Sequence, residues 1–225
     1  MRKPPSRTEI YNEIDSQIVN VFRVLRDESK AKKLTELLDL TPFAVQEYQD
    51  CYAPPIDDVD AARKVICRSF FGIGSDSVFK MNGFRRGFKN KQLDSKNAFA
   101  SYSECIPYFI ERLRDVIIEN LDWADVIKIY DSPKTLFYVD PPYLKETRTS
   151  RTVKYQFEFT KSDHIELANT LNACKGNVIL SGYPSDLYTQ LFEGWFATSK
   201  STTTILGLKR IEKIWIKRQE RTLFL

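Results

Sequence analysis

Apolar and polar residues along the first part of this chain follow a pattern that predicts one strand and then several helices. Residues 8–14 have the alternation of a short strand, and residues 15–26 place apolar side chains at the spacing of three and four that is typical of a helix. Two further helices are expected over 30–40 and 43–53, and another begins at about Asp57 and continues to Phe70. The first third of the chain is therefore expected to be mainly helical.

The segment 71–94 has no sustained period. It contains four glycines among serines, lysines and arginines, and we expect a glycine-rich basic insertion there. A long helix is expected over 96–119, where the apolar residues return to helical spacing.

The second half of the chain contains β-rich runs. Three apolar runs are expected to be strands, namely Val126–Tyr130, Leu136–Val139 and Asn177–Leu180. A helix expected over 161–173 separates the last two, and a strand, a helix and a strand in this order indicate a parallel sheet. Two further runs, Trp195–Ile205 and Ile211–Ile216, are expected to form a closing antiparallel hairpin.

The composition is that of a globular protein. The 225 residues are 42% hydrophobic and 28% charged with a net charge of +4, which excludes a disordered or collagen-like chain. No apolar run approaches the roughly 20 residues of a membrane span, and the N-terminus lacks the apolar core of a signal peptide. We therefore expect a cytoplasmic protein that does not contact a membrane.

The cysteines and the single histidine indicate no metal site. The four cysteines lie far apart without C-x-x-C spacing, and His164 alone cannot complete a zinc site. We expect no metal, reduced and mostly buried thiols, and a structural role for His164.

The tetrapeptide Asp140-Pro141-Pro142-Tyr143 is the most informative feature, because it directly follows the predicted strand Leu136–Val139. In open α/β sheets, ligands bind at the carboxyl ends of strands. The prolines make the loop rigid and leave carbonyl acceptors beside the Asp140 carboxylate. Such acceptors suit an amino group, and Tyr143 offers a flat surface for a base. The alternative is a purely structural turn stiffened by proline.

Several motifs together resemble one enzyme family. They are YNEID at 11–15 with FRVLR at 22–26, DPPY at 140–143, FTKSDH at 159–164 and NVILSGY at 177–183. In spelling and order they resemble the Dam-like, DPPY-type adenine-specific DNA methyltransferases, especially those of phages and mobile elements. The resemblance covers nearly the whole chain, and it implies a Rossmann-like α/β fold that uses S-adenosylmethionine as its cofactor.

The resemblance also implies roles for individual residues. Asp140 and the Pro141 carbonyl would bind the adenine amino group, with Pro142 completing the rigid loop and Tyr143 stacking on the flipped base. The candidate contacts to the cofactor are Glu13, Asp15 and Asp140, with Glu13 on the ribose hydroxyls, where the family more usually has Asp. For Glu13 and Asp15, the alternative is a favourable charge at the N-terminus of the following helix.

Two basic runs are the candidates for contact with duplex DNA. Residues 63–91 contain eight Lys or Arg residues against one acidic residue, and this segment resembles the family's target-recognition region. The candidates here are Arg85, Arg86, Lys89 and Lys91, of which Arg85 or Arg86 can also read guanine edges. A second run, Lys145, Arg148, Arg151 and Lys154, is expected to hold phosphates beside the flipped base. For both runs the alternative is a solvated basic surface.

One family signature is missing. A glycine-rich F-x-G-x-G turn should precede YNEID by about a helix, so that the backbone can approach the cofactor, but Met1 stands too close to allow it. The similar sequence Phe71–Ser75 follows a predicted helix and lies on the wrong side of YNEID, so we expect it not to be this turn unless the motif order is permuted. We therefore expect the sheet to lack its first, central strand. The N-terminal segment would be encoded separately, omitted by a start-site assignment or lost.

The expected organisation is a catalytic domain of residues 1–29 and 120–225 with a helical, basic target-recognition insertion at 30–119. The expected reaction transfers a methyl group from S-adenosylmethionine to the exocyclic amino group of adenine in duplex DNA, with base flipping. A separately encoded N-terminal fragment and a cognate restriction enzyme are the other partners considered. The alternatives are an inactive DNA-binding remnant and a methyltransferase for RNA or a protein amide.

Overall fold

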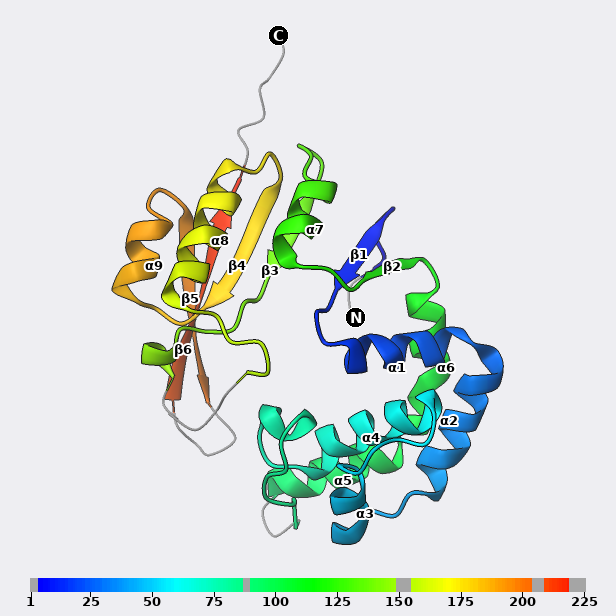
Figure 1. Ribbon diagram of the computed structural model, residues 1–225. Coiled ribbons are helices and arrows are strands. Elements are labelled where there is room, and N and C mark those ends of the chain that lie inside the picture. The colour runs from blue at the N-terminus through cyan, green and yellow to red at the C-terminus, as the bar shows by residue number, and fades with distance from the viewer. Residues whose placement is uncertain (1–3, 87–89, 149–154, 204–208, 219–225) are drawn as a thin grey trace. The chain divides into compact units, whose positions relative to one another are not determined.

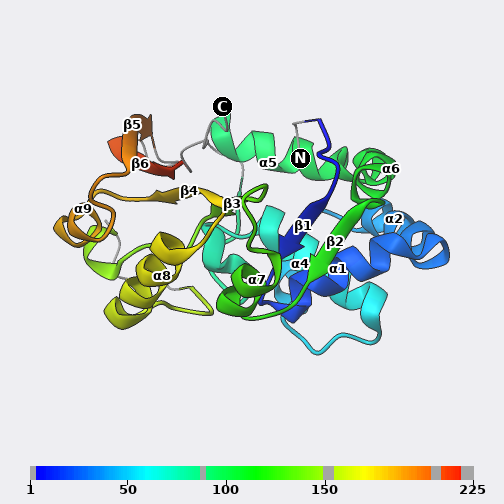
Figure 2. The same cartoon turned by 90° about the horizontal axis from the view of Figure 1, so that it is seen from above.

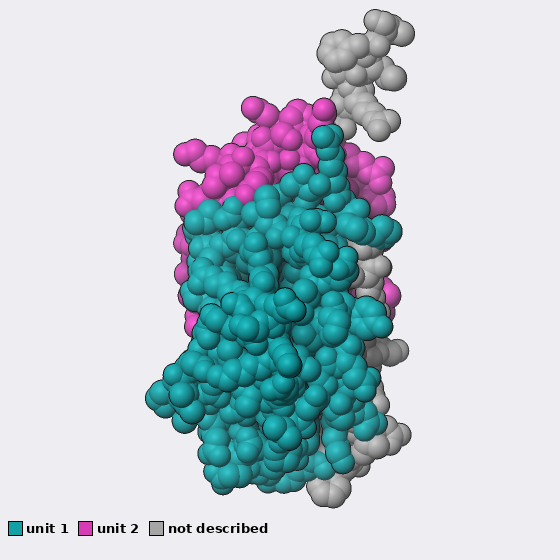
Figure 3. Space-filling model, turned by 90° about the vertical axis from the view of Figure 1, so that its right-hand side faces the viewer, with its two compact units in different colours: residues 1–122 teal, residues 123–225 magenta. Residues whose placement is uncertain are grey.

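A computed structural model describes residues 4–86, 90–148, 155–203 and 209–218 (Figure 1). The chain divides into two compact units. Unit 1 comprises residues 1–122 and unit 2 comprises residues 123–225, shown in teal and magenta in Figure 3.

Unit 1 combines a two-stranded parallel sheet with a group of helices. Its elements along the chain are β1 (Glu9–Asn12), α1 (Ser16–Arg26), α2 (Glu28–Leu40), α3 (Val45–Asp50), α4 (Asp58–Phe71), the 3₁₀ helix η1 (Ser75–Val78), α5 (Asn90–Ala100), α6 (Tyr102–Leu113) and β2 (Val116–Glu119). Strands β1 and β2 pair in parallel, with Glu9 opposite Val116. The predicted strand and the helices that follow it are confirmed in this region.

Side-chain caps explain why two of these helices begin where they do. The Asp15 carboxylate accepts from the backbone N–H of Gln17 at the start of α1, and the Asp57 carboxylate accepts from the N–H of Asp60 at the start of α4. Each cap satisfies a donor that the first helical turn leaves unpaired. The apolar stripes of these helices then meet in one core.

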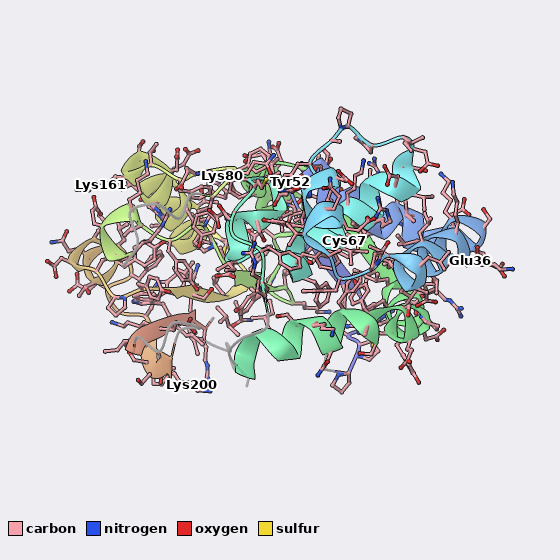
Figure 4. The ribbon with its side chains drawn as sticks, turned by 90° about the horizontal axis from the view of Figure 1, so that it is seen from below. Glu36, Tyr52, Cys67, Lys80, Lys161 and Lys200 are labelled. Carbon is pink, nitrogen blue, oxygen red and sulfur yellow. The ribbon has the colours of Figure 1, made fainter. Side chains whose placement is uncertain are left out.

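The cysteines follow the prediction of reduced, mostly buried thiols. Cys51, Cys67 and Cys174 are buried and Cys105 is exposed, and all four are free. Cys67 lies on α4 and is labelled in Figure 4.

The predicted long helix over 96–119 is wrong. The chain there forms two helices, α5 and α6, and then the strand β2. Val116, Ile117 and Ile118 pair with β1, more than 100 residues away in the sequence. This distant pairing overrides a local apolar spacing that suits a helix equally well, because strand preference depends on context.

Unit 2 contains a four-stranded mixed sheet. Its elements are α7 (Trp123–Tyr130), β3 (Leu136–Val139), the 3₁₀ helix η2 (Lys145–Thr147), α8 (Lys161–Ala173), β4 (Asn177–Gly182), α9 (Asp186–Leu191), β5 (Phe196–Thr203) and β6 (Lys209–Lys217). The strand order is β3-β4-β6-β5. Strands β3 and β4 are parallel, and β6 is antiparallel to both β4 and β5. The predicted parallel pair and the closing hairpin are therefore confirmed.

The predicted strand over 126–130 is wrong, because these residues belong to helix α7. Trp123, Ile127 and Tyr130 are spaced by four and three, as on one face of a helix, and Ile127 is buried in the core of unit 2. The run of β-branched residues suggested a strand, but a helix buries the same apolar side chains.

Helices α7, α8 and α9 all pack on one face of this sheet, where Leu171, Leu180 and Trp215 are buried. Figure 2 shows α8 along one side of β4. On the opposite face, Leu136 and Tyr138 of β3 keep 61% and 66% of their surface exposed. None of the helices in the described ranges is long and apolar enough to cross a membrane.

The structure is a mixed α/β protein in which both parallel pairs have open edges, because β1, β2 and β3 each have a single neighbour among the described strands. Among the described strands, β1 pairs only with β2, and β3 only with β4. A further strand at these edges stays a prediction.

The division into units differs from the expected organisation, because residues 1–29 lie in unit 1 with the predicted insertion. Helix α1 packs on α2, α4 and α6 there. The assignment of residues 1–29 and 120–225 to one catalytic domain stays a prediction.

Candidate active site

The corner Asp140–Tyr143 lies where the sequence places it, directly after β3 (Figure 1). Asp140 is exposed and Pro141 is buried. One carboxylate oxygen of Asp140, Oδ1, accepts a hydrogen bond from the hydroxyl of Ser181 at 2.7 Å. Strand β4, which carries Ser181, is the parallel neighbour of β3, so both side chains lie at the same end of the sheet.

Aromatic rings accompany this carboxylate. The Tyr143 ring meets Tyr183 edge-on, with ring centroids 4.6 Å apart. Burial and then the neighbouring Asp140 charge raise the pKa of the Tyr143 hydroxyl, which also forms a hydrogen bond with Asp140. Tyr143 therefore stays neutral at physiological pH and presents an uncharged ring.

Arg148 holds the corner from inside the protein. Its guanidinium donates two hydrogen bonds to the Tyr143 carbonyl, one of them from Nε at 2.6 Å. It also forms an ion pair with Glu158 at 2.7 Å and lies over the Tyr155 ring. The Arg148 side chain is only 7% exposed, and the hydrogen bond from Arg148 lowers the pKa of Glu158. The guanidinium of Arg148 is thus engaged with the loop, and its contact with phosphate stays a prediction.

Glu13 follows the last residue of β1, and its carboxylate is half-buried. Oε1 accepts from the backbone N–H of Asp15 at 3.1 Å, and Oε2 accepts from the Tyr11 hydroxyl at 3.4 Å. Burial first and the Glu13 charge second raise the pKa of Tyr11 to about 12. A carboxylate offers about four acceptor positions, so Glu13 retains capacity for further donors.

Two asparagines join the ends of β1 and β2. Asn12 exchanges two hydrogen bonds with the backbone of Leu121, both at 3.1 Å. Asn120 donates from Nδ2 to the carbonyls of Glu13 at 2.7 Å and Ile14 at 3.2 Å. These bonds fix the loop from which the Glu13 side chain projects.

Asp15 has a structural position. It is buried, and its carboxylate caps α1. This is the alternative role of Asp15, a charge at a helix N-terminus, and its contact with the cofactor stays a prediction.

The basic candidates lie in different environments. Arg85 is partly buried, and its guanidinium donates to the Gly72 carbonyl and the Ser95 hydroxyl, while burial lowers its pKa. Arg86 and Lys145 are exposed. Lys91 lies in α5, where only its backbone is described. Lys89, Arg151 and Lys154 lie outside the described residues.

The turn Phe71–Ser75 begins at the last residue of helix α4, so it follows a helix, as predicted. Side chains of the protein itself occupy the space beside Gly72 in this turn. A Cβ atom on Gly72 would lie 2.3 Å from Cβ of Ser77 and 2.7 Å from the Tyr48 hydroxyl. Beneath the turn, the hydroxyl of Tyr52 donates to the Ser77 carbonyl at 2.5 Å (Tyr52 is labelled in Figure 4). The room that glycine leaves is thus taken by the protein's own side chains and does not form a cradle for a ligand.

The described residues therefore fit one part of S-adenosylmethionine. The Glu13 carboxylate suits a pair of ribose hydroxyls, since it has acceptor capacity left. For the methionine part, the described turn that spells the family motif, 71–75, has the space beside Gly72 already occupied. No group of three or more His, Cys, Asp or Glu side chains within the described ranges has the placement to hold a metal ion.

The sequence alone gives no role to Ser181 or Tyr183, although both belong to the motif NVILSGY. Their contacts with the corner follow from the pairing of β3 with β4. The rule that ligands gather where neighbouring parallel strands end could have identified them.

Comparison with known families agrees with the motifs at 140–143, 159–164 and 177–183. Residues 73–214 match the sequence model of the D12 class N6 adenine-specific DNA methyltransferase family. No protein of curated function matches the chain.

Proposed function

Because this chain belongs to the D12 class N6 adenine-specific DNA methyltransferase family, we propose that it transfers a methyl group from S-adenosylmethionine to the exocyclic amino group of adenine in duplex DNA. The observation that carries the proposal is the environment of Asp140. Its carboxylate is exposed at the end of a parallel strand and is followed by two prolines that have no N–H to donate to it.

The corner can hold an amino group in a reactive orientation. The two hydrogens of the adenine NH₂ would be donated to the Asp140 carboxylate and the Pro141 carbonyl, which directs the nitrogen lone pair away from both acceptors. When bound, S-adenosylmethionine supplies an electron-poor methyl group. The Asp140 carboxylate would also take the proton that the methylated nitrogen must lose. Tyr143 would stack on the flipped base.

The reaction as proposed does not use His164. This side chain is wholly buried, and its Nδ1 is hydrogen-bonded to the Tyr188 hydroxyl at 2.8 Å. Burial lowers the pKa of His164. A structural role, as predicted, is therefore favoured over a general base.

The remaining parts of the proposal concern the cofactor and DNA. Glu13 would hold the ribose hydroxyls of the cofactor. Arg86 and Lys145 are the described candidates for phosphate contacts, since both are exposed and cationic. Lys89, Lys91 and Arg151 remain candidates by sequence alone, and a cognate restriction enzyme remains a proposed partner.

One alternative has a specific observation in its favour. Ser77 and Tyr48 occupy the space beside Gly72 in the turn at 71–75, where the family's cofactor turn would need room. An inactive DNA-binding remnant, or an enzyme completed by a separately supplied N-terminal segment, would have this property.

Transfer of tritium from labelled S-adenosylmethionine to unmethylated bulk DNA tests the proposal. The assay is run with and without an added N-terminal strand-and-turn peptide, and we expect incorporation by the protein under at least one of these conditions. In Asp140→Ala we expect the rate to fall about 100-fold or more, by analogy with removal of one stabilising group from an active site. Asp186→Ala, another exposed aspartate of unit 2, is the matched control and should keep its rate.

Equal incorporation by Asp140→Ala would refute the assignment of the corner. DNA binding without incorporation under both conditions would instead identify the inactive remnant.

A further inference from the structure

A side chain of the neighbouring strand contacts the candidate carboxylate directly. Ser181 lies in β4, one residue after Leu180, which is opposite Val139 in the parallel register. Strand alternation puts Leu180 in the core and Ser181 on the other face, beside the carboxylate that follows β3. Only 8% of the Ser181 surface is nevertheless exposed, so its hydroxyl is largely shielded from water.

The geometry of this contact is that of a strong hydrogen bond. The distance from Ser181 Oγ to Asp140 Oδ1 is 2.7 Å, whereas the distance to the Val139 carbonyl is 3.2 Å. The shorter value falls in the range of hydroxyl-to-carboxylate bonds, which are about twice as strong as neutral ones. The single hydroxyl hydrogen is therefore directed mainly at Asp140.

Such a bond controls how the carboxylate is turned. The last torsion of an aspartate side chain is broad and roughly two-fold, so an exposed Asp140 has no intrinsic preference for one plane. Holding Oδ1 on Ser181 fixes that plane from the strand side, while the Tyr143 hydroxyl lies on the corner itself. A carboxylate offers about four acceptor positions, so Asp140 keeps capacity for a donor from outside. The two prolines cannot set it, because neither has an N–H.

We propose that Ser181 is a positioning residue, which orients the Asp140 carboxylate so that one oxygen accepts from the 6-amino group of adenine. The inference rests on the proposed function and assigns Ser181 no contact with substrate, cofactor or reacting atoms. It predicts that the Ser181 hydroxyl is needed for the corner to bind a purine with a 6-amino group more tightly than one without it.

Binding of two short single-stranded DNA probes measures this property without methyl transfer. One carries adenine and the other carries purine, which lacks the amino group, and both are followed by fluorescence anisotropy. The whole chain should bind the adenine probe about tenfold more tightly, a difference typical of one hydrogen bond to a charged group. Ser181→Ala should reduce this preference to less than about twofold, and Ser181→Thr, which keeps the hydroxyl, should restore it.

A cap of helix α9 provides the matched control. Ser185 accepts from the N–H of Tyr188 at 3.1 Å, so Ser185→Ala removes a serine hydrogen bond from the same unit without touching Asp140. It should lower the melting temperature about as much as Ser181→Ala and leave the preference for adenine unchanged.

The inference is overturned if Ser181→Ala keeps the full preference, if Ser185→Ala loses it equally, or if the unaltered chain shows none. A methyl-transfer assay distinguishes failure of this inference from failure of the proposed function. Incorporation by the unaltered chain and by Ser181→Ala at equal rates would overturn only the role of Ser181. Absence of both incorporation and adenine preference in the unaltered chain would overturn the proposed function as well.

Discussion

Glu13 and Asp140 occupy equivalent positions in two parallel strand pairs, yet their surroundings differ. Each follows the last residue of a strand, β1 or β3. Glu13 is half-buried and accepts from the N–H of Asp15, two residues further along. Asp140 is exposed, and two residues after it stands Pro142, which has no N–H.

This difference shows how the residues next to a carboxylate determine whether its oxygens stay available to a ligand. A free backbone N–H two residues on competes for carboxylate oxygens, as in the common turns formed by Asp and Asn. Proline removes that competitor at Asp140, so the remaining acceptor capacity is left to an external donor. Glu13, in contrast, is held by its own loop and suits a role in which a ligand adds to existing hydrogen bonds.

Changing the length of each carboxylate should produce the largest contrast. Asp140→Glu adds a methylene group and displaces the acceptor by about 1 Å, so kcat should fall about 100-fold. Glu13→Asp keeps the carboxylate and shortens its side chain by one methylene group, so it should raise the KM for S-adenosylmethionine by less than about tenfold, equivalent to less than about 1.4 kcal/mol. Steady-state kinetics with labelled cofactor measure both values. Similar losses in the two variants would contradict the distinction between a reacting and a holding carboxylate.

Restoring an N–H near Asp140 should have an intermediate effect. In Pro142→Ala, the backbone can donate to the Asp140 carboxylate as Asp15 does to Glu13, and we expect kcat to fall about tenfold, equivalent to about 1.4 kcal/mol. Pro184→Ala, at an exposed proline after β4, is the control for lost rigidity. An unchanged kcat in Pro142→Ala would show that the missing N–H is unimportant.

Weakening the support of Glu13 should have the smallest effect. Asn120→Ala removes the hydrogen bonds to the carbonyls of Glu13 and Ile14, and we expect the KM for the cofactor to rise about 2- to 10-fold with kcat unchanged. The control is Asn20→Ala, which removes a similar bond to the Asp58 carbonyl at 2.8 Å. Equal effects of the two variants on KM would mean that only general stability is measured.

Local patterns predicted those elements whose stabilising contacts lie nearby in the sequence. The caps at Asp15 and Asp57 satisfy N–H groups within three residues, so the starts of α1 and α4 could be inferred. Strand β3 could be inferred because its apolar run is short and ends at a proline corner. The segments 116–119 and 126–130 could not, since their apolar spacings suit a helix and a strand alike.

The candidate site shows the same division. Asp140, the prolines and Tyr143 are adjacent in the sequence, so the motif itself identifies them. Ser181 is 41 residues from Asp140, and only the register of β3 with β4 brings them together. The role of Arg148 was also beyond prediction, because the sequence does not show that its guanidinium is engaged by Tyr143 and Glu158.

By itself the sequence determined the proline corner, the acidic residue after the first strand and the family of the chain. These features depend on residues next to one another, whose backbone preferences act whatever lies around them. The tertiary structure alone decided which strand borders each carboxylate, which arginines are engaged inside the protein and which oxygen of Asp140 is already taken. Those outcomes depend on contacts between residues far apart in the chain, which form only when distant segments pack together.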